Sequence, residues 1–239
     1  EITQQFQAAL ETDKKMQFKL NSKAKEITKT HVIFEDADGK EQKIKHNKTL
    51  ISIGRKANTH CGLENIEVNV EKGFIPIDDR CQTNIPGVYA IGDVTGKLML
   101  AHTASRHGEI VIDNMLGKNV EIDYNKVPTV IYGTPEIGEI GITESKAKEQ
   151  GIEVVVKKLS MMYSGKFVVE DTSYQGLFKI ILKKDTEEII GMSAFGNAAS
   201  ELIHMGSIIV GKRFSKEQMR TLIFAHPTIG EIIKDVIFS

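Results

Sequence analysis

A histidine and a glutamate near the C-terminus have the residue types and spacing needed for acid–base chemistry. The segment HPTIGE, residues 226–231, places His226 five positions before Glu231. A carboxylate that orients an imidazole can make it an effective general base or acid. The spacing from Thr228 to Glu231 is also that of a helix capping box, in which Glu231 would only start a helix and His226 would be an ordinary loop residue. The spacing alone favours the capping interpretation.

A second candidate is Asp93, which follows Gly92 at the end of the apolar stretch 88–91. If this stretch is a buried strand, the carboxylate lies in the crevice where open α/β sheets bind ligands, and it suits sugar or polyol hydroxyls. The segment MLAH, residues 99–102, then opens a helix whose free amides favour an anionic or electron-rich group. In the alternative, Asp93 only caps a turn and His102 is a partly buried residue at a helix start.

The sequence gives no support for other kinds of ligand site. No two glycines are separated by a single residue, so the Gly-x-Gly-x-x-Gly dinucleotide loop is absent, and so is a P-loop. The seven histidines show no i,i+4 pairing or cluster with cysteine, so we expect no metal site. Cys61 and Cys81 are too few for a disulfide scaffold and too far apart for a CxxC pair, so we expect ordinary thiols.

Length and composition indicate a globular protein. The 239 residues are 41% hydrophobic and 26% charged, which is enough to bury a core, and the formal net charge of -1 gives no surplus for nucleic-acid binding. No apolar run reaches the roughly 18 residues that cross a bilayer. We therefore expect a soluble intracellular protein without nucleic-acid or membrane partners. Because Glu1 stands directly inside an amphipathic pattern, we expect a piece of a longer protein.

The first half of the chain has the pattern of an α/β layer. Apolar residues at helical spacing predict a helix around residues 2–10. Alternation and turn residues predict strands, and the predicted strands cover residues 17–29, 31–36, 43–45, 49–54, 73–77 and 88–91. The pair Asp38-Gly39 predicts a hairpin turn, and a helix over 101–115 is expected to end at Gly117.

The second half changes to strands followed by helices, which is an α+β arrangement. The predicted strands cover residues 129–132, 138–142, 154–159, 177–182 and 189–195, and the predicted helices cover residues 198–210, 215–223 and 228–238. Residues 161–163 (MMY) are expected to pack as part of a strand rather than to hold a cofactor.

Several motifs together resemble one family. They are FKLN (18–21), IGRKANT (53–59), TNIPGVYAIGD (83–93), MLAH (99–102), VPTVIYGTPEI (127–137), ELIH (201–204) and AHPTIGE (225–231). In this order they resemble the C-terminal half of the dihydrolipoamide dehydrogenases, a branch of the FAD-dependent pyridine-nucleotide disulfide oxidoreductases. The YAIGD box is shared by many flavoprotein reductases, whereas MLAH followed by AHPTxxE is more specific to this branch. Glutathione and mercuric-ion reductases are disfavoured by MLAH.

The resemblance implies an architecture and a set of site residues. It implies the C-terminal part of a Rossmann-like NAD-binding domain (1–54), a central FAD-associated domain (55–126) and an α+β interface domain that forms a homodimer (127–239). It assigns His226 as the acid–base acting on the substrate dithiol of the other subunit, oriented by Glu231. The FAD ribityl chain is assigned to Asp93, the flavin ring to the backbone of Met99, Leu100, Ala101 and His102, and the NAD pocket to Gly54 and, less directly, Ala24.

The resemblance also implies an activity and its partners. The family oxidises dihydrolipoamide with reduction of NAD⁺, in 2-oxo acid dehydrogenase complexes such as the pyruvate dehydrogenase complex or in glycine cleavage. The expected partner is a lipoyl-bearing acyltransferase, and the expected location is the cytoplasm. The family's glycine-rich nucleotide loops and redox-active C-x4-C pair would lie upstream of Glu1, so we expect this chain to be inactive alone. A rival hypothesis is a dimerisation module that needs no cofactor.

Four places depart from the family pattern. Ala57 stands where proline is usual, Gly133-Thr134-Pro135 replaces Thr-His-Pro, Asn197 replaces a proline, and Arg106-His107 replaces an acidic pair. We expect these departures to alter local loop geometry.

Overall fold

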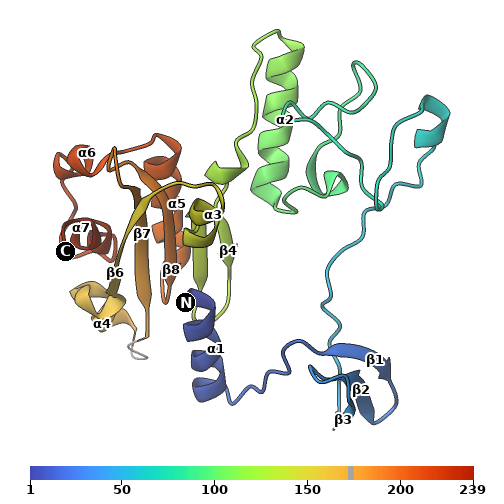
Figure 1. Ribbon diagram of the computed structural model, residues 1–239, viewed down its shortest axis with the longest axis horizontal. Coiled ribbons are helices and arrows are strands. Elements are labelled where there is room, and N and C mark those ends of the chain that lie inside the picture. Colours follow the sequence, from blue (N-terminus) through green and yellow to red (C-terminus); the bar gives the residue numbers. More distant parts are fainter. Residues whose placement is uncertain (172–174) are drawn as a thin grey trace. The chain divides into compact units, whose positions relative to one another are not determined.

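The computed structural model describes residues 1–171 and 175–239 and divides the chain into two compact units. One unit consists of residues 8–56, and the other of residues 1–7 together with 57–239 (Figure 1). Helix α1 (Ile2–Asp13), which the apolar spacing predicts, spans the boundary between them. Within the described part of the chain, no helix is long and apolar enough to cross a membrane.

The unit of residues 8–56 contains a three-stranded antiparallel sheet. Its strands are β1 (Lys23–Ile27), β2 (His31–Glu35) and β3 (Glu41–Lys45), with β2 in the centre. The hairpin predicted at Asp38-Gly39 is confirmed: Gly39 has φ +76°, which glycine adopts without strain, and the Asp36 carboxylate accepts hydrogen bonds from two turn amides. The first predicted strand is shorter than expected, because residues 17–22 do not join the ladder.

The strand predicted over residues 49–54 is absent. These residues form neither helix nor strand, and Leu50 and Ile53 are 89% and 93% exposed. A buried strand needs hydrogen-bonded neighbours on its edges and apolar cover on its faces. Among the described residues no strand lies beside this segment, so its apolar pattern has nothing to pack against.

Residues 57–126 fold around one small core with little regular structure. The elements are η1 (Leu63–Ile66), η2 (Gly92–Thr95), α2 (Ala101–Met115) and η3 (Tyr124–Lys126). The core is built from apolar side chains, and its buried members are Val68, Ile75, Ile77, Cys81, Ala90, Ile110, Val111 and Ile122. Helix α2 has the predicted bounds, and Gly117 (φ +80°) follows its C-cap as expected.

The strands predicted over 73–77 and 88–91 are wrong as secondary structure. The two stretches contribute only isolated bridges, Glu71 with Phe74 and Gln82 with Tyr89. Most of their apolar side chains nevertheless lie in or against the core described above, whereas Ile91 is 46% exposed. The Ile75 amide donates to the Val94 carbonyl in η2 and the Ala90 amide to the Cys81 carbonyl, and neither bond belongs to a strand ladder. The apolar pattern therefore indicates burial and not strand pairing.

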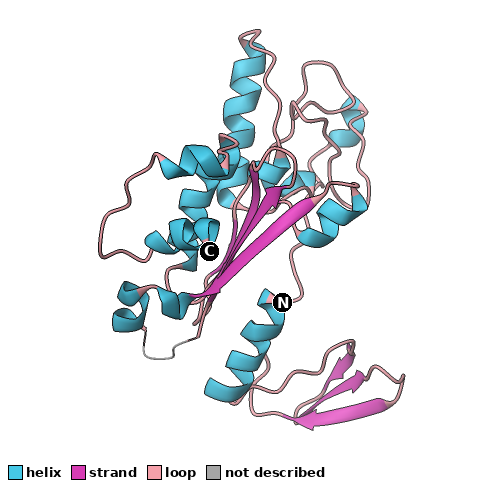
Figure 2. Ribbon diagram, turned by 60° about the vertical axis from the view of Figure 1, so that its left-hand side comes forward, coloured by secondary structure: helices cyan, strands magenta, loops and turns pink. Residues whose placement is uncertain are grey.

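Residues 127–239 form a five-stranded antiparallel sheet in the order β4-β5-β8-β7-β6 (Figures 1 and 2). The strands are β4 (Thr129–Ile131), β5 (Ile137–Gly141), β6 (Val154–Ser160), β7 (Leu177–Lys183) and β8 (Ile189–Phe195). All five lie close to the ranges predicted from the sequence. Every pairing is between antiparallel strands that this part of the chain itself supplies, which is why the local pattern suffices.

Helices complete the larger core. Those that contribute buried residues to it are α4 (Gly165–Glu170), α5 (Ala199–Gly211), α6 (Lys216–Arg220) and α7 (Glu231–Phe238), whereas α3 (Glu144–Glu149) lies beside β6. The core cluster joins Phe178 and Ile180 of β7 to Leu202 of α5 and Ile233 of α7, all at most 1% exposed. Helices α3 and α4 were not predicted, because six residues are too few to show a helical period. The segment 161–163 is a short 3₁₀ helix, η4, rather than a strand.

Candidate functional site

The structure brings His226 and Glu231 together. Glu231 is the first residue of α7, and its carboxylate oxygens lie 3.0 and 3.2 Å from His226 Nδ1. Because a carboxylate only accepts, Nδ1 is the protonated ring nitrogen in this contact. The ring's other nitrogen, Nε2, therefore carries a lone pair and can accept a proton, and the His226 side chain is 83% exposed. A ring held and exposed in this way has the geometry that a general base requires.

The structure contains only one of the two hydrogen bonds expected of a capping box. The Thr228 amide donates to Glu231 Oε2 at 2.8 Å, but the Thr228 hydroxyl donates to the Ala225 carbonyl at 2.7 Å and does not cap α7. The helix begins at Glu231, three residues later than predicted. One carboxylate thus serves both the backbone and the histidine. The Thr228 amide, and then His226, hold the pKa of Glu231 below its usual range, so the carboxylate stays ionised and keeps orienting the ring.

The structure also brings Asp93 close to the start of α2. Gly92 has φ +74°, and a Cβ at this position would lie 3.2 Å from the Ala104 side chain, so η2 and α2 approach closely because residue 92 is glycine. The Asp93 carboxylate is exposed, and no partner for it occurs among residues 1–171 and 175–239. Leu100, the N-cap of α2, is extended and provides no side-chain cap, so the first amides of the helix are open. These features fit a ligand with hydroxyls at one end and an electron-rich group at the other.

His102 differs from the partly buried histidine of the alternative interpretation. It is exposed, and its Nε2 donates to the Pro128 carbonyl at 2.8 Å. The contact ties the start of α2 to the segment that leads into β4.

His107 is a site residue that the sequence did not indicate as one. It is fully buried, and its Nδ1 accepts the Gly92 amide at 3.2 Å. Because a backbone N–H only donates, Nδ1 is unprotonated, and Nε2 donates to the Tyr124 hydroxyl at 3.0 Å. Burial, and then Lys97, lower the pKa of His107 and keep it neutral. The only sequence signal was that His107 belongs to a pair that departs from the family pattern.

We predict that His107 makes the chain acid-sensitive. A histidine with a lowered folded-state pKa contributes stability that is present above its ordinary value of 6.5 and is lost as the pH falls below it. We expect the free energy of unfolding to decrease below pH 6.5 with a slope of up to about 1.4 kcal/mol per pH unit from this group. In urea titrations at several pH values, His107→Gln should reduce this decrease in the free energy of unfolding below pH 6.5. The exposed control His60→Gln should leave the decrease unchanged. The same decrease in His107→Gln as in the wild type would show that His107 is not the group responsible.

The residues expected to bind NAD remain a prediction. Gly54 and Ala24 both belong to the unit of residues 8–56 and are exposed. Gly54 has φ +106°, and apart from its two chain neighbours no described residue has an atom within 4 Å of where its Cβ would be. Ala24 lies on β1 opposite Phe34.

The two cysteines have opposite environments. Cys61 is exposed, whereas Cys81 is fully buried in the small core. Burial, and then the charges of Asp78 and Asp79, raise the pKa of Cys81 to about 11. No group of histidine, cysteine and acidic residues suited to a metal ion occurs in the described ranges.

We predict that only Cys61 reacts with thiol reagents in the folded protein. Near pH 8 the buried Cys81 is almost entirely protonated, so it should react at least ~100-fold more slowly than Cys61. Mass spectrometry after brief labelling should find one adduct, which Cys61→Ser removes. Two adducts at equal rates would show that the core around Cys81 is open.

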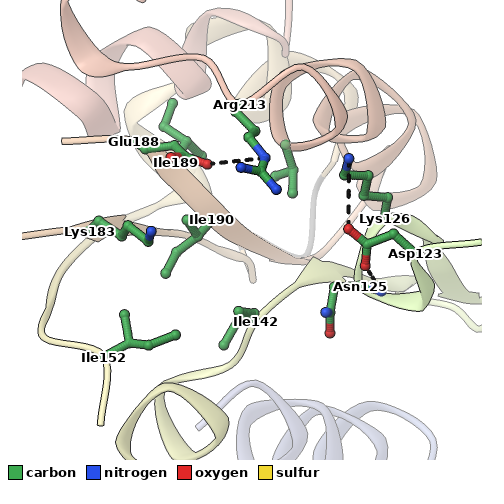
Figure 3. Close-up of a pocket in the computed structure, with 11 residues that line it drawn as sticks. Asp123, Asn125, Lys126, Ile142, Ile152, Lys183, Glu188, Ile189, Ile190 and Arg213 are labelled. Atoms are coloured by element: carbon green, nitrogen blue, oxygen red, sulfur yellow. Dashed lines mark hydrogen bonds and ion pairs between the residues drawn. The ribbon is translucent and has the colours of Figure 1, made fainter. Parts of the chain in front are cut away.

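A small cleft of about 190 Å³ lies beside η3, the β7–β8 hairpin and the end of α5 (Figure 3). Its floor is apolar, with Ile142 and Ile190 among the lining residues. Two of its cations stand beside carboxylates: Arg213 Nε lies 3.8 Å from Glu188, and Lys126 lies 3.7 Å from Asp123. Acidic and basic side chains therefore line this cleft together, with Asp123 and Glu188 both among the lining residues.

Comparison with known proteins finds one family over most of the chain. Residues 1–108 match the family described as pyridine nucleotide-disulphide oxidoreductase, and residues 127–237 match its dimerisation domain. Dihydrolipoyl dehydrogenase 1, mitochondrial, of Arabidopsis thaliana is 37% identical over 98% of this chain and 47% of its own length. Dihydrolipoyl dehydrogenase of Bacillus subtilis (strain 168) is 34% identical over 82% of this chain and 42% of its own length.

A solved structure shows the same fold. The Cu(II) complex of a mutant of RclA, the HOCl-induced flavoprotein disulfide reductase of Escherichia coli, is 25% identical, covers 99% of this chain and 54% of that one, and has a TM-score of 0.86. The chain thus spans about half the length of the curated relatives it matches. Since the two matched regions together take in most of the sequence, the chain belongs to the pyridine nucleotide-disulphide oxidoreductase family.

Proposed function

We propose that the chain supplies the C-terminal half of a dihydrolipoamide dehydrogenase, which oxidises protein-bound dihydrolipoamide to lipoamide and reduces NAD⁺. The contact of His226 Nδ1 with Glu231, which leaves Nε2 open to solvent, is the observation that carries the proposal. The relatives named dihydrolipoyl dehydrogenase support the choice of substrate.

His226 acts by moving one proton. Its Nε2 takes the proton of a substrate thiol, and the resulting thiolate attacks one sulfur of an enzyme disulfide, because the thiolate and not the thiol is the nucleophile. A new S–S bond forms, the enzyme S–S bond breaks, and the released thiolate keeps the electron pair. The second substrate thiol gives its proton to the enzyme thiolate released first and attacks the substrate sulfur of the mixed disulfide. The lipoyl disulfide forms, the mixed disulfide breaks, and the second enzyme thiolate leaves with the electron pair, so two electrons leave the substrate. Glu231 holds the ring tautomer throughout and stabilises the protonated ring.

The residues near α2 fit an FAD cofactor. The free Asp93 carboxylate can accept hydrogen bonds from ribityl hydroxyls, and the uncapped start of α2 offers amides to the polar edge of the flavin ring beside residues 99–102. When bound, FAD passes the two electrons from the dithiol to NAD⁺. His107 keeps the Gly92 backbone in place through its hydrogen bond, next to Asp93.

We also propose the assembly and the setting. The match of residues 127–237 to a dimerisation domain supports a homodimer through this region, in which His226 of one copy serves the disulfide of the other. A lipoyl-bearing acyltransferase of a 2-oxo acid dehydrogenase complex, such as the pyruvate dehydrogenase complex, would present the substrate. We propose a cytoplasmic location, with no nucleic-acid partner.

The rival function is a dimerisation module that needs no cofactor. A flavin absorbance spectrum of the purified chain, with and without added FAD, separates the cofactor question from dimerisation. We expect no stable flavin binding and no turnover by the 239-residue chain alone, and turnover of dihydrolipoamide once it is joined to a half that brings the disulfide and the nucleotide loops. Absence of turnover in the joined protein, with FAD bound, would contradict the proposed activity.

A further inference from the structure

A second cleft lies between the start of α2, the segment leading into β4, and α5. It has a volume of about 490 Å³, within the usual range of small-molecule sites. The lining residues are His102, Thr103, Arg106, Lys126, Val127, Pro128, Val130, Tyr132, Ser200, His204 and Ser207. We propose that this cleft binds a small molecule that carries a phosphate group, and nothing in the redox chemistry above requires it.

The charge of the lining favours an anion. Arg106 and Lys126 are cationic, and the lining residues in the described part of the chain include no aspartate or glutamate. This stands out in a chain whose formal net charge is -1. Arginine and lysine are the side chains that proteins use most to bind phosphate, the former through several parallel N–H donors.

Arg106 and Lys126 both have N–H groups that can still donate to a ligand. Arg106 contacts Glu109 through Nη1 alone, at 2.7 Å, which leaves its other N–H groups available. Lys126 lies 3.7 Å from Asp123, too far for a hydrogen bond. The His102 ring donates to the Pro128 carbonyl through Nε2, which fixes the ring at the edge of the cleft.

Thr103 gives an independent indication. It lines the cleft, is 0% exposed, and its hydroxyl has no hydrogen-bond partner among the described residues. A threonine in a helix normally bonds a carbonyl of the preceding turn, so an orphan hydroxyl in a cleft needs another partner. A phosphate oxygen is a strong acceptor and satisfies it.

The rest of the cleft suits an apolar or aromatic group. Val127, Pro128 and Val130 provide apolar wall, and Tyr132, whose side chain is 80% exposed, can lie over it. We therefore infer a phosphate monoester with an apolar or aromatic group, rather than a free polyphosphate. The cleft uses a different face of α2 from Ala104, which packs against Gly92 beside Asp93.

Phosphate binding by the 239-residue chain tests the proposal. Phenyl phosphate and inorganic phosphate would be titrated at constant ionic strength and followed by backbone NMR shifts. We expect saturable shifts at residues 102–106 and 126–132, tighter binding of phenyl phosphate than of inorganic phosphate, and at least tenfold weaker binding in the double variant Arg106→Gln, Lys126→Gln. The matched control is Lys118→Gln, which removes a cation near the other end of α2.

Thr103→Val separates a ligand role from a structural one. The change removes the hydroxyl at nearly constant volume, so we expect weaker phosphate binding, by about threefold or more, with a melting temperature that is unchanged or higher. Binding that is equal in the wild type, the Arg106/Lys126 double variant and Thr103→Val would overturn the proposal, as would shifts spread over all exposed lysines. Melting curves of each variant establish that it is folded. Because no flavin or disulfide is involved, failure here leaves the proposed oxidoreductase function untouched.

Discussion

Replacing His226 by glutamine should lower dihydrolipoamide oxidation by ~100-fold or more, the usual scale for loss of a general base. The measurement is steady-state NADH formation from dihydrolipoamide, made on the chain joined to the half that brings the disulfide and the nucleotide loops. Glutamine keeps polarity and approximate size but cannot take the thiol proton from the position of Nε2. His226 is 83% exposed, so the change should leave the fold intact.

Two comparisons make this result specific. Electron transfer from NADH to an artificial acceptor needs no proton transfer from a dithiol, so it should survive in His226→Gln. In Glu231→Gln the amide oxygen can still accept the Thr228 amide, but the charge that stabilises the protonated ring is lost, so we expect a smaller loss of about tenfold. Intact lipoamide turnover in His226→Gln would mean that His226 is an ordinary loop residue. Loss of both activities would make it a folding residue.

Replacing Ile223 by aspartate should weaken self-association of the chain by ~100-fold or more. Ile223 is 99% exposed, and Ile208 and Leu222 are 58% and 38% exposed in the same matched dimerisation region. Large apolar side chains left in water at these levels indicate a surface that a partner covers, and an aspartate there would be buried without a partner for its charge.

Sedimentation at micromolar concentration measures the effect. The wild-type chain should sediment as a dimer and Ile223→Asp as a monomer. Leu50→Asp is the matched control, because Leu50 is 89% exposed but lies in the unit of residues 8–56. A wild-type monomer, or dissociation by Leu50→Asp and not by Ile223→Asp, would contradict the assigned interface.

How far the sequence predicts the fold depends on whether a segment's neighbours lie within the chain. Strands such as β8 (Ile189–Phe195) match their predicted bounds, because β5 and β7 flank β8 and its buried side chains belong to one core. The apolar stretch 49–54 has the same kind of pattern but no strand beside it among the described residues, and it forms none. A hydrophobic pattern therefore predicts that a segment tends to be buried, while the presence of neighbouring strands decides whether the segment forms a strand.

In the candidate site, too, the sequence indicates some residues, while others can be identified only from their neighbours in the structure. The sequence indicates His226 and Glu231 but does not exclude a capping box, because a carboxylate at that spacing can bind either the ring or the backbone. In the structure, the Glu231 carboxylate binds both the His226 ring and the Thr228 amide. His107 could not be identified, because its role depends on Gly92, fifteen residues away, presenting an amide to the ring. Orphan hydroxyls such as that of Thr103 are likewise visible only once all neighbours are placed.

The central claim is that His226 acts on a dithiol bound at the disulfide of the other copy. Mixed dimers test it directly, in the joined protein, with one copy carrying His226→Gln and the other copy carrying serines in place of the redox cysteines. Each parent should be nearly inactive, and random mixing should restore about a quarter of the wild-type dihydrolipoamide activity, because half of the dimers are mixed and each holds one complete site. Activity that stays at the level of the two parents after mixing, with mixed dimers shown to be present, would contradict the claim.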